Sequence, residues 1–418
     1  DLYKAFLWRF WFLTSKNRGR IGIVFPRTGL SSKGSEKFRR KLFESADSIN
    51  ITTLVNAKNW VFDMEARYTI AVASILKSLQ PSNKTITIKG PYSSYESFDS
   101  EREIESQKIK TTELLNWNES VSLPVLPSTY SLEVFTQLRK SPWFSLNKKD
   151  QWRVRPDREM DQTNQKFLMD FSENHPKDFW KVYKGASFEI WNPDTGSYNA
   201  FADPSKVLTW IQEKRLRSHK KKDSVHSEYP KEYLIDKKTL SPLSARIVVR
   251  DVTNRTNTRT VIACLIPPQT FITNKGPVLM FPRGDKKDES YLLGVLCSIP
   301  LDWYARRFVE TNLNFFILNS FPIPRPSRDN PLWMKVVKLS GRLACSDERF
   351  KDWAYEVGVD YGPLEPEIKL EMMCKIDAIV SKLYGLSEKH LIHIFETFHE
   401  GWNYESRLNK VLNFFHEY

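Results

Sequence analysis

An apolar run of strand length near the start of the chain constrains the fold more than any other single feature. Residues 20–25 are mostly apolar and a proline closes them; a polar loop then leads to Ser35, a typical helix N-cap residue, with Glu36 in the first turn. Two further β-rich apolar runs cover residues 49–55 and 68–76. A strand, a helix and two strands in this order predict the far edge of a doubly wound α/β sheet.

The chain enters this pattern without a start of its own. A helix is predicted over residues 2–15, and neither an initiator Met nor a signal peptide precedes it. We therefore expect residues 1–85 to be the C-terminal part of an α/β domain whose remainder lies upstream.

The character of the sequence changes after that domain. Residues 86–125 are polar and rich in Ser, Thr and Glu, so we predict an extended linker. Residues 126–330 are aromatic-rich, punctuated by prolines and dense in Arg, and they predict a mixed, largely β domain. Residues 331–418 predict a helical region, because apolar side chains from Ile368 to Leu383 recur on one helical face. Within the second domain, the predicted helices cover 205–217 and 291–309, and the predicted strands include 179–190, 246–250 and 260–266.

The composition indicates a globular protein with a polyanionic partner. The chain has 418 residues, of which 40% are hydrophobic and 27% charged, and its formal net charge is +13. Such an excess of positive charge favours nucleic acid as the partner. No apolar run approaches the ~18–20 residues of a membrane helix, so we expect no membrane association and a cytoplasmic location. Four widely spaced cysteines predict free thiols and no metal site.

The sequence carries no catalytic signature. It has no glycine-rich nucleotide turn and no GxSxG elbow. Asp157, Glu159 and Asp161 weakly resemble a metal-nuclease pattern, but Met160 and Asp161 stand where a lysine is expected, so we interpret this segment as a polar loop. We therefore assign no catalytic residue and no metal ligand.

Residues 246–259 have the composition of a base-reading segment. Arginines are mixed there with Asn and Thr, and Arg246 and Arg250 would share one face of a strand. Arg and Asn are the side chains that read guanine and adenine edges. The alternative is a solvated strand edge blunted by charge. The predicted base-reading residues are Arg246, Arg250, Arg255, Asn257 and Arg259.

Two further segments are candidates for contact with DNA. The basic run over residues 214–222 is typical of sequence-independent phosphate binding, with a solvated helix end as the alternative. The paired Arg306 and Arg307, together with Asn312, could line a DNA face, although packing against the sheet is the alternative for that helix. The predicted phosphate-binding residues are Lys214, Arg215, Arg217, Lys220 and Lys221.

A series of short motifs occurs in a fixed order along the chain, including Asn312-Leu313-Asn314-Phe315 and the following Phe321-Pro322-Ile323-Pro324. The whole set covers residues 20–28, 38–42, 62–68, 161–164, 182–188, 250–253, 259–263, 312–315, 321–324, 376–380 and 383–387. Together they resemble the C-terminal half of the large adenine-specific DNA methyltransferases of restriction-modification and phage-defence systems. This is the Eco57I-like, type IIG/IIL-like group, in which a methyltransferase domain and a DNA target-recognition domain share one polypeptide.

The resemblance implies a fold and a function. Residues 1–85 would be part of a class I methyltransferase sheet, 126–330 the target-recognition domain and 331–418 a helical C-terminal region. The complete enzyme would transfer a methyl group from S-adenosylmethionine to the N6 of adenine in double-stranded DNA.

The family's FxGxG-type cofactor turn and its (Asn/Asp/Ser)-Pro-Pro-aromatic catalytic motif are not in this sequence. In the family both motifs precede the segment that this chain resembles. We therefore expect this chain alone to be inactive and to need an N-terminal methyltransferase segment or a partner subunit. The alternatives are a non-catalytic DNA-specificity subunit completed by a partner chain, and a basic RNA- or protein-binding scaffold.

Overall fold

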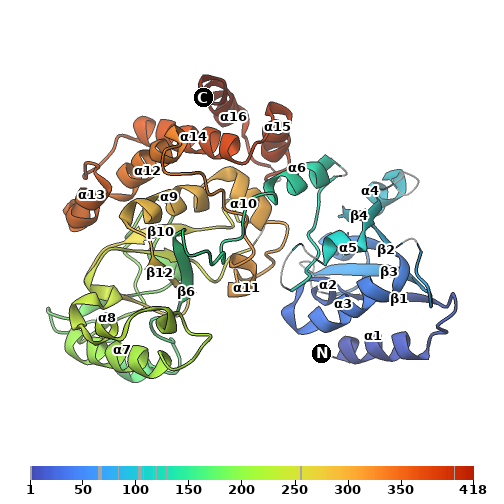
Figure 1. The fold of residues 1–418 in the computed structure, drawn as a ribbon, viewed down its shortest axis with the longest axis horizontal. Helices are drawn as coiled ribbons and strands as arrows, with labels where there is room; N and C mark the ends of the chain where they lie inside the picture. Colours follow the sequence, from blue (N-terminus) through green and yellow to red (C-terminus); the bar gives the residue numbers. More distant parts are fainter. Residues whose placement is uncertain are drawn as a thin grey trace. The chain divides into compact units, whose positions relative to one another are not determined.

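The computed structural model describes residues 2–64, 68–82, 84–101, 106, 108–115, 117, 120–128, 130–254, 257–399 and 401–418. The chain divides into two compact units, Asp1–Arg139 and Lys140–Tyr418 (Figure 1).

The first unit is built on a mixed sheet with the strand order β1-β3-β2-β4-β5. β3 lies antiparallel between β1 and β2, whereas β2 and β4 are parallel. Since β1 and β2 both run against β3, they run parallel to each other, with a helix in the crossover between them. The expected strand, helix, strand, strand order is therefore present, but most neighbouring strands pair antiparallel. The strands are β1 (Arg20–Pro26), β2 (Ala46–Val55), β3 (Thr69–Lys77), β4 (Thr85–Tyr92) and β5 (Lys108–Lys110).

Helices accompany this sheet in chain order. They are α1 (Leu2–Leu13), α2 (Thr28–Ser31), α3 (Glu36–Ser45), α4 (Tyr95–Glu101), α5 (Thr111–Leu114) and α6 (Tyr130–Leu138). Ser35 precedes α3 as expected, but its side chain makes no capping hydrogen bond.

The segment that we expected to be an extended linker contributes to this sheet. β4 and β5 both fall within or at the border of residues 86–125 and pair with each other. Ile86, Ile109 and Leu114 are buried, so widely spaced apolar residues were enough to anchor a polar stretch. Farther along, the fully buried Arg39 donates to the carbonyls of Ser120 and Val121, and burial lowers the pKa of Arg39 to about 10.

The second unit contains two sheets. The four-stranded sheet has the order β10-β9-β12-β6, and the three-stranded sheet has the order β11-β7-β8. Val248 and Ile266 of the first sheet share a buried apolar cluster with Tyr183 and Ile272 of the second. The strands are β6 (Arg153–Asp157), β7 (Trp180–Tyr183), β8 (Ala200–Ala202), β9 (Arg246–Val249), β10 (Ala263–Ile266), β11 (Thr270–Ile272) and β12 (Val278–Arg283).

Helices surround these sheets. α7 packs Val207 and Ile211 against the three-stranded sheet, and α9 and α10 lie between the four-stranded sheet and the C-terminal helices (Figure 1). The helices are α7 (Pro204–Ser218), α8 (Lys231–Ile235), α9 (Lys286–Leu296), α10 (Ile299–Ala305), α11 (Phe315–Leu318), α12 (Pro331–Ala344), α13 (Lys351–Val357), α14 (Pro366–Leu383), α15 (Glu388–Glu396) and α16 (Glu405–Glu417). Within the described residues, none of these helices is both long and apolar enough to cross a membrane.

The helix predicted over residues 291–309 is two helices. α9 ends at Leu296 and α10 begins at Ile299, with Pro300 in its first turn, where proline is tolerated because no intrahelical N–H bond is needed. The predicted C-terminal helix is confirmed as α14, and Ser387 caps α15 by accepting from the N–H of His390.

Candidate nucleic-acid interface

Three loops leave the four-stranded sheet at the same end. Val278, the first residue of β12, is paired with Asp157, the last residue of β6, and with Val248, near the end of β9. The segments after β6, after β9 and before β12 must therefore emerge side by side.

Backbone bonds tie these loops to a fourth segment. The N–H of Asp251 donates to the carbonyl of Lys275 at 2.9 Å, and the carbonyl of Asp251 accepts from the N–H of Leu313 at 2.8 Å. Val252 and Asn312 form an isolated antiparallel bridge. We call residues 158–162, 250–254, 273–277 and 311–315 the sheet-end loops.

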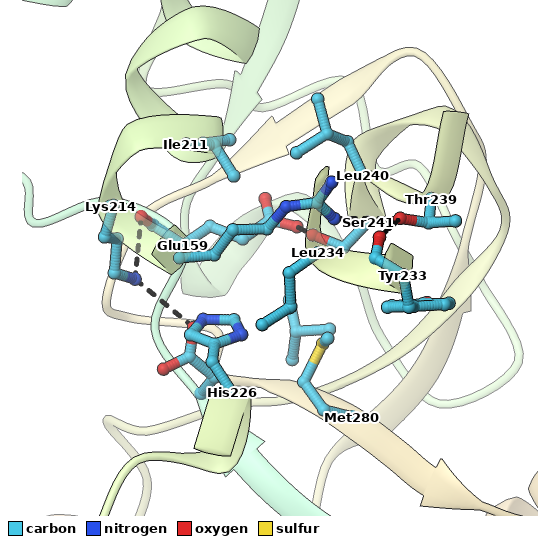
Figure 2. A pocket seen from close by; sticks show the side chains of 13 residues that line it. Glu159, Ile211, Lys214, His226, Tyr233, Leu234, Thr239, Leu240, Ser241 and Met280 are labelled. Carbon is cyan, nitrogen blue, oxygen red and sulfur yellow. Dashed lines mark hydrogen bonds and ion pairs between the residues drawn. The ribbon is translucent and has the colours of Figure 1, made fainter. Parts of the chain in front are cut away.

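Buried ion pairs determine which side chains of the loop after β6 face outward. Glu159 is 3% exposed; Nε and Nη2 of Arg246 donate to its two oxygens at 2.7 and 2.9 Å, and the hydroxyl of Ser241 donates at 2.7 Å. Asp157 lies 3.2 Å from the ammonium of Lys214 and 3.6 Å from Nε2 of His226 (Figure 2).

The pKa of Asp157 follows from these neighbours. Burial would raise it, but the hydrogen bond from His226 and the positive charge of Lys214 hold the pKa of Asp157 below its ordinary value. Successive side chains of an extended backbone point in opposite directions, so Arg158 is turned outward. It is exposed, and its guanidinium lies 4.7 Å from the centre of the Phe315 ring. The acids of the weak nuclease-like pattern thus orient this arginine.

Several arginines proposed for base reading or a DNA face are internal. Arg246 is 5% exposed and bound to Glu159, so that interpretation is corrected. Asp302, which is fully buried, accepts from Nε of Arg259 at 2.5 Å and lies 3.5 Å from Nε of Arg306. Arg307 is also buried, and its Nε donates to the carbonyl of Trp303. For Arg306 and Arg307 the structure favours the packing alternative, and for Arg259 a structural ion pair.

The remaining predicted residues of these segments lie in or beside the sheet-end loops. Arg250 is half-buried and donates to the carbonyl of Phe188 and, at 2.8 Å, to the carboxylate of Glu189. Asn257 and Asn312 are also half-buried. Arg255 lies outside the described residues.

The predicted phosphate-binding run divides into an internal and an external part. Lys214 binds Asp157 and the carbonyls of Arg158 and Glu159, and Arg215 is 4% exposed with bonds to Thr239 and the carbonyl of Asp236. These two assignments are corrected, since both side chains hold α7 in place.

Three residues of the run are exposed on the surface. Arg217 is 3.5 Å from Glu213, one turn earlier on α7. Lys220 and Lys221 are exposed, and neither side chain has a hydrogen bond or ion pair within the described part of the chain. These residues keep their prediction.

Sequence reasoning missed three residues of the sheet-end loops. They are Arg158, Lys275 and Asp251. Burial raises the pKa of Asp251, while the charges of Arg158 and Lys275 act to lower it. The alternation of Asp157, Arg158 and Glu159 was a usable signal for Arg158, whereas nothing in the sequence identifies Lys275. No set of three or more His, Cys, Asp or Glu residues within the described ranges could hold a metal ion.

Comparison with known proteins gives structural likenesses only. No protein-family model and no curated protein matches this chain. The solved structures with a similar fold include the type IIG restriction endonuclease BpuSI, at 13% identity and a TM-score of 0.34 over 88% of this chain and 47% of that one. The type IIL restriction-modification enzyme MmeI in complex with DNA matches at 14% identity and a TM-score of 0.42, over 95% of this chain and 52% of that one. A DrdV–DNA complex matches at 11% identity and a TM-score of 0.39, over 81% and 38%. The chain thus spans about half the length of these proteins or less.

Proposed function

We propose that this chain recognises a specific sequence in double-stranded DNA, as the recognition part of a site-specific adenine-N6 DNA methyltransferase of a restriction-modification or phage-defence system. The observation that carries the proposal is the set of sheet-end loops. They gather Arg158, Arg250, Lys275 and Asn312 from four separate segments at one end of a rigid sheet.

The chemistry of these side chains suits base reading. Arg and Lys bind the O6 and N7 of guanine, and Asn binds the N6 and N7 of adenine in the major groove. Arg217, Lys220 and Lys221 would add phosphate contacts that carry no sequence information. The buried pairs of Asp157 and Glu159 hold the reading loop in one conformation, which lowers the entropy lost on binding.

The methyl-transfer part of the proposal rests on the family resemblance. The complete enzyme would use S-adenosylmethionine and would turn the target adenine out of the duplex, at a cost of a few kcal/mol. An N-terminal methyltransferase segment or a partner subunit would supply the cofactor turn and the catalytic motif. No residue of this chain is assigned to either task.

The DNA-binding part is tested by selection from a pool of random duplexes at a fixed salt concentration. We expect the purified chain to enrich one short sequence motif and to bind it in the presence of competitor DNA. Binding that is uniform across sequences and vanishes at moderate salt would contradict a recognition unit and favour the scaffold alternative. Stronger binding to single-stranded RNA would do the same.

The enzymatic part needs a second measurement. The complete polypeptide, or this chain with its partner subunit, is incubated with labelled S-adenosylmethionine and the selected duplex. Label on adenine within the motif supports the methyltransferase, and replacing the adenines of the motif should abolish it. Specific binding without any transfer would favour a non-catalytic specificity subunit.

A further inference from the structure

Most buried acids of the second unit have an obvious partner. The buried carboxylates among the described residues are Glu159, Asp251, Asp288, Glu289, Asp302 and Asp377. Glu159 binds Arg246, Asp288 binds Arg328, and Glu289 binds Lys286 and the indole of Trp353. Asp302 binds Arg259 and the N–H of Thr260, and Asp377 binds Arg407 and the N–H of Ile299.

Asp251 differs from all of them. The residue is 6% exposed, and within the described part of the chain its Oδ1 is buried without a hydrogen-bond partner. Its carboxylate forms no ion pair within 4 Å there either, although Arg158 and Lys275 are near enough to influence its charge. A buried acceptor without a partner is destabilising by about 1–3 kcal/mol, and more when it is charged.

The position of Asp251 is fixed. Its N–H and its carbonyl are both bonded, to Lys275 and Leu313, and the next residue forms the bridge to Asn312. The backbone therefore cannot carry the carboxylate into solvent without breaking the sheet-end loops apart. A polar group that is held rigidly and left without a partner in a native fold calls for an explanation, and function is a common one.

We propose that the carboxylate of Asp251 is a specificity-determining acceptor for the exocyclic amino group of a target base, the N4 of cytosine or the N6 of adenine. Both groups donate in the major groove, and carboxylates pair with them. Arg158 and Lys275 favour the ionised, accepting form and offset the repulsion between this acid and the DNA phosphates. The inference rests on the proposed DNA recognition and deepens it.

The test is the substitution Asp251→Asn in the full chain. Asparagine has nearly the same shape but carries no charge, and one of its two terminal groups is a donor. The matched control is Asp360→Asn, which changes the net charge equally at an exposed position between α13 and α14. Each protein is used to select duplexes from a random pool, and its Tm is measured.

For Asp251→Asn we expect the preference at one base pair to change while the rest of the motif stays. Affinity for the wild-type motif should fall about 10-fold or more, in line with the cost of one lost charge-assisted hydrogen bond. The Tm should stay the same or rise, because a buried unpaired charge is removed. Asp360→Asn should select the wild-type motif with unchanged affinity.

Other outcomes separate this inference from the proposed function. An unchanged motif with a lower Tm would overturn the inference and assign Asp251 a purely structural role. An unchanged motif with an unchanged Tm would also overturn it, while leaving DNA recognition in place. If the wild-type chain selects no motif, the proposed function itself fails.

Discussion

The inside of the second unit and its sheet-end loops use the same residue types for opposite purposes. Arg246 and Arg259 are held by buried acids, so their donors are spent on the fold. Arg158 is exposed, and Asp251 is an acid without a partner among the described residues. The difference teaches that burial and pairing, rather than residue type or spacing, decide which charges of a basic chain can meet a ligand.

The largest effect should come from breaking an internal pair. Arg246→Ala leaves the buried carboxylate of Glu159 without its main partner, and we expect the free energy of unfolding to fall by about 3–5 kcal/mol. Chemical denaturation of both proteins measures the difference.

A double variant provides the control. Arg246→Met combined with Glu159→Leu removes both charges and should recover most of that loss, because a well-packed apolar pair can replace a buried ion pair. If Arg246→Ala instead kept its stability and lost sequence-specific binding, Arg246 would belong with the reading residues and the comparison would fail.

Arg158 is the corresponding test in the sheet-end loops. Arg158→Ala should leave the Tm nearly unchanged, because the side chain is exposed. Affinity for the selected duplex should fall by about 1–3 kcal/mol, with relaxed specificity at one base pair. Competition binding with single-base variants of the motif measures both effects.

Lys351→Ala is the matched control for Arg158→Ala, since it removes one exposed positive charge at the start of α13. It should change neither the affinity nor the motif. An equal loss in both variants would show that only total charge matters and would remove Arg158 from the reading set.

The contrast between these regions explains how far the sequence could be interpreted. Local patterns predicted β1, β2 and β3, the helix after Ser35, and α14, because alternation, helical periodicity and capping residues act over short distances. The segment 86–125 was misjudged because its anchoring residues, such as Ile86 and Ile109, are isolated within a polar stretch.

Long-range pairing could not be predicted. Glu159 and Arg246 are 87 residues apart, and Asp302 and Arg259 are 43 apart, so neither pair leaves a local signal. Without those partners, every arginine of the segment 246–259 looked equally available. The same limit hid Asp251, whose importance lies in a partner that it does not have.

The pH dependence of stability should reveal the state of Asp251. Burial raises the pKa of this carboxyl in the folded chain, so the fold favours the neutral acid. The stability that this gives is present below the unfolded pKa of about 3.9 and is lost as the pH rises through the raised folded value. Asp251→Asn does not titrate and escapes that loss.

The Tm of Asp251→Asn minus that of the wild type should therefore grow as the pH rises from acid to neutral, and then level off. Differential scanning fluorimetry over a pH series measures this difference, and Asp360→Asn should give a flat line. A difference that shrinks with rising pH would mean that the ionised carboxylate is stabilised in the fold, which contradicts the absence of a partner.

The smallest effect should come from the surface lysines beyond α7. Lys220→Ala combined with Lys221→Ala should weaken binding equally for all sequences and reduce the slope of log affinity against log salt concentration by about 2, because each lysine releases about one counterion. The buried Arg215, on the same basic run, predicts a different result: Arg215→Ala should lower stability through its lost bonds to Thr239 and Asp236, without a change in the salt slope of the folded protein. Titrations at several salt concentrations, with the Tm of each variant, separate the two. A changed base preference in the lysine variant would show that this run reads sequence after all, and an equal drop of the salt slope for Arg215→Ala would show that burial does not divide the run into structural and DNA-contacting parts.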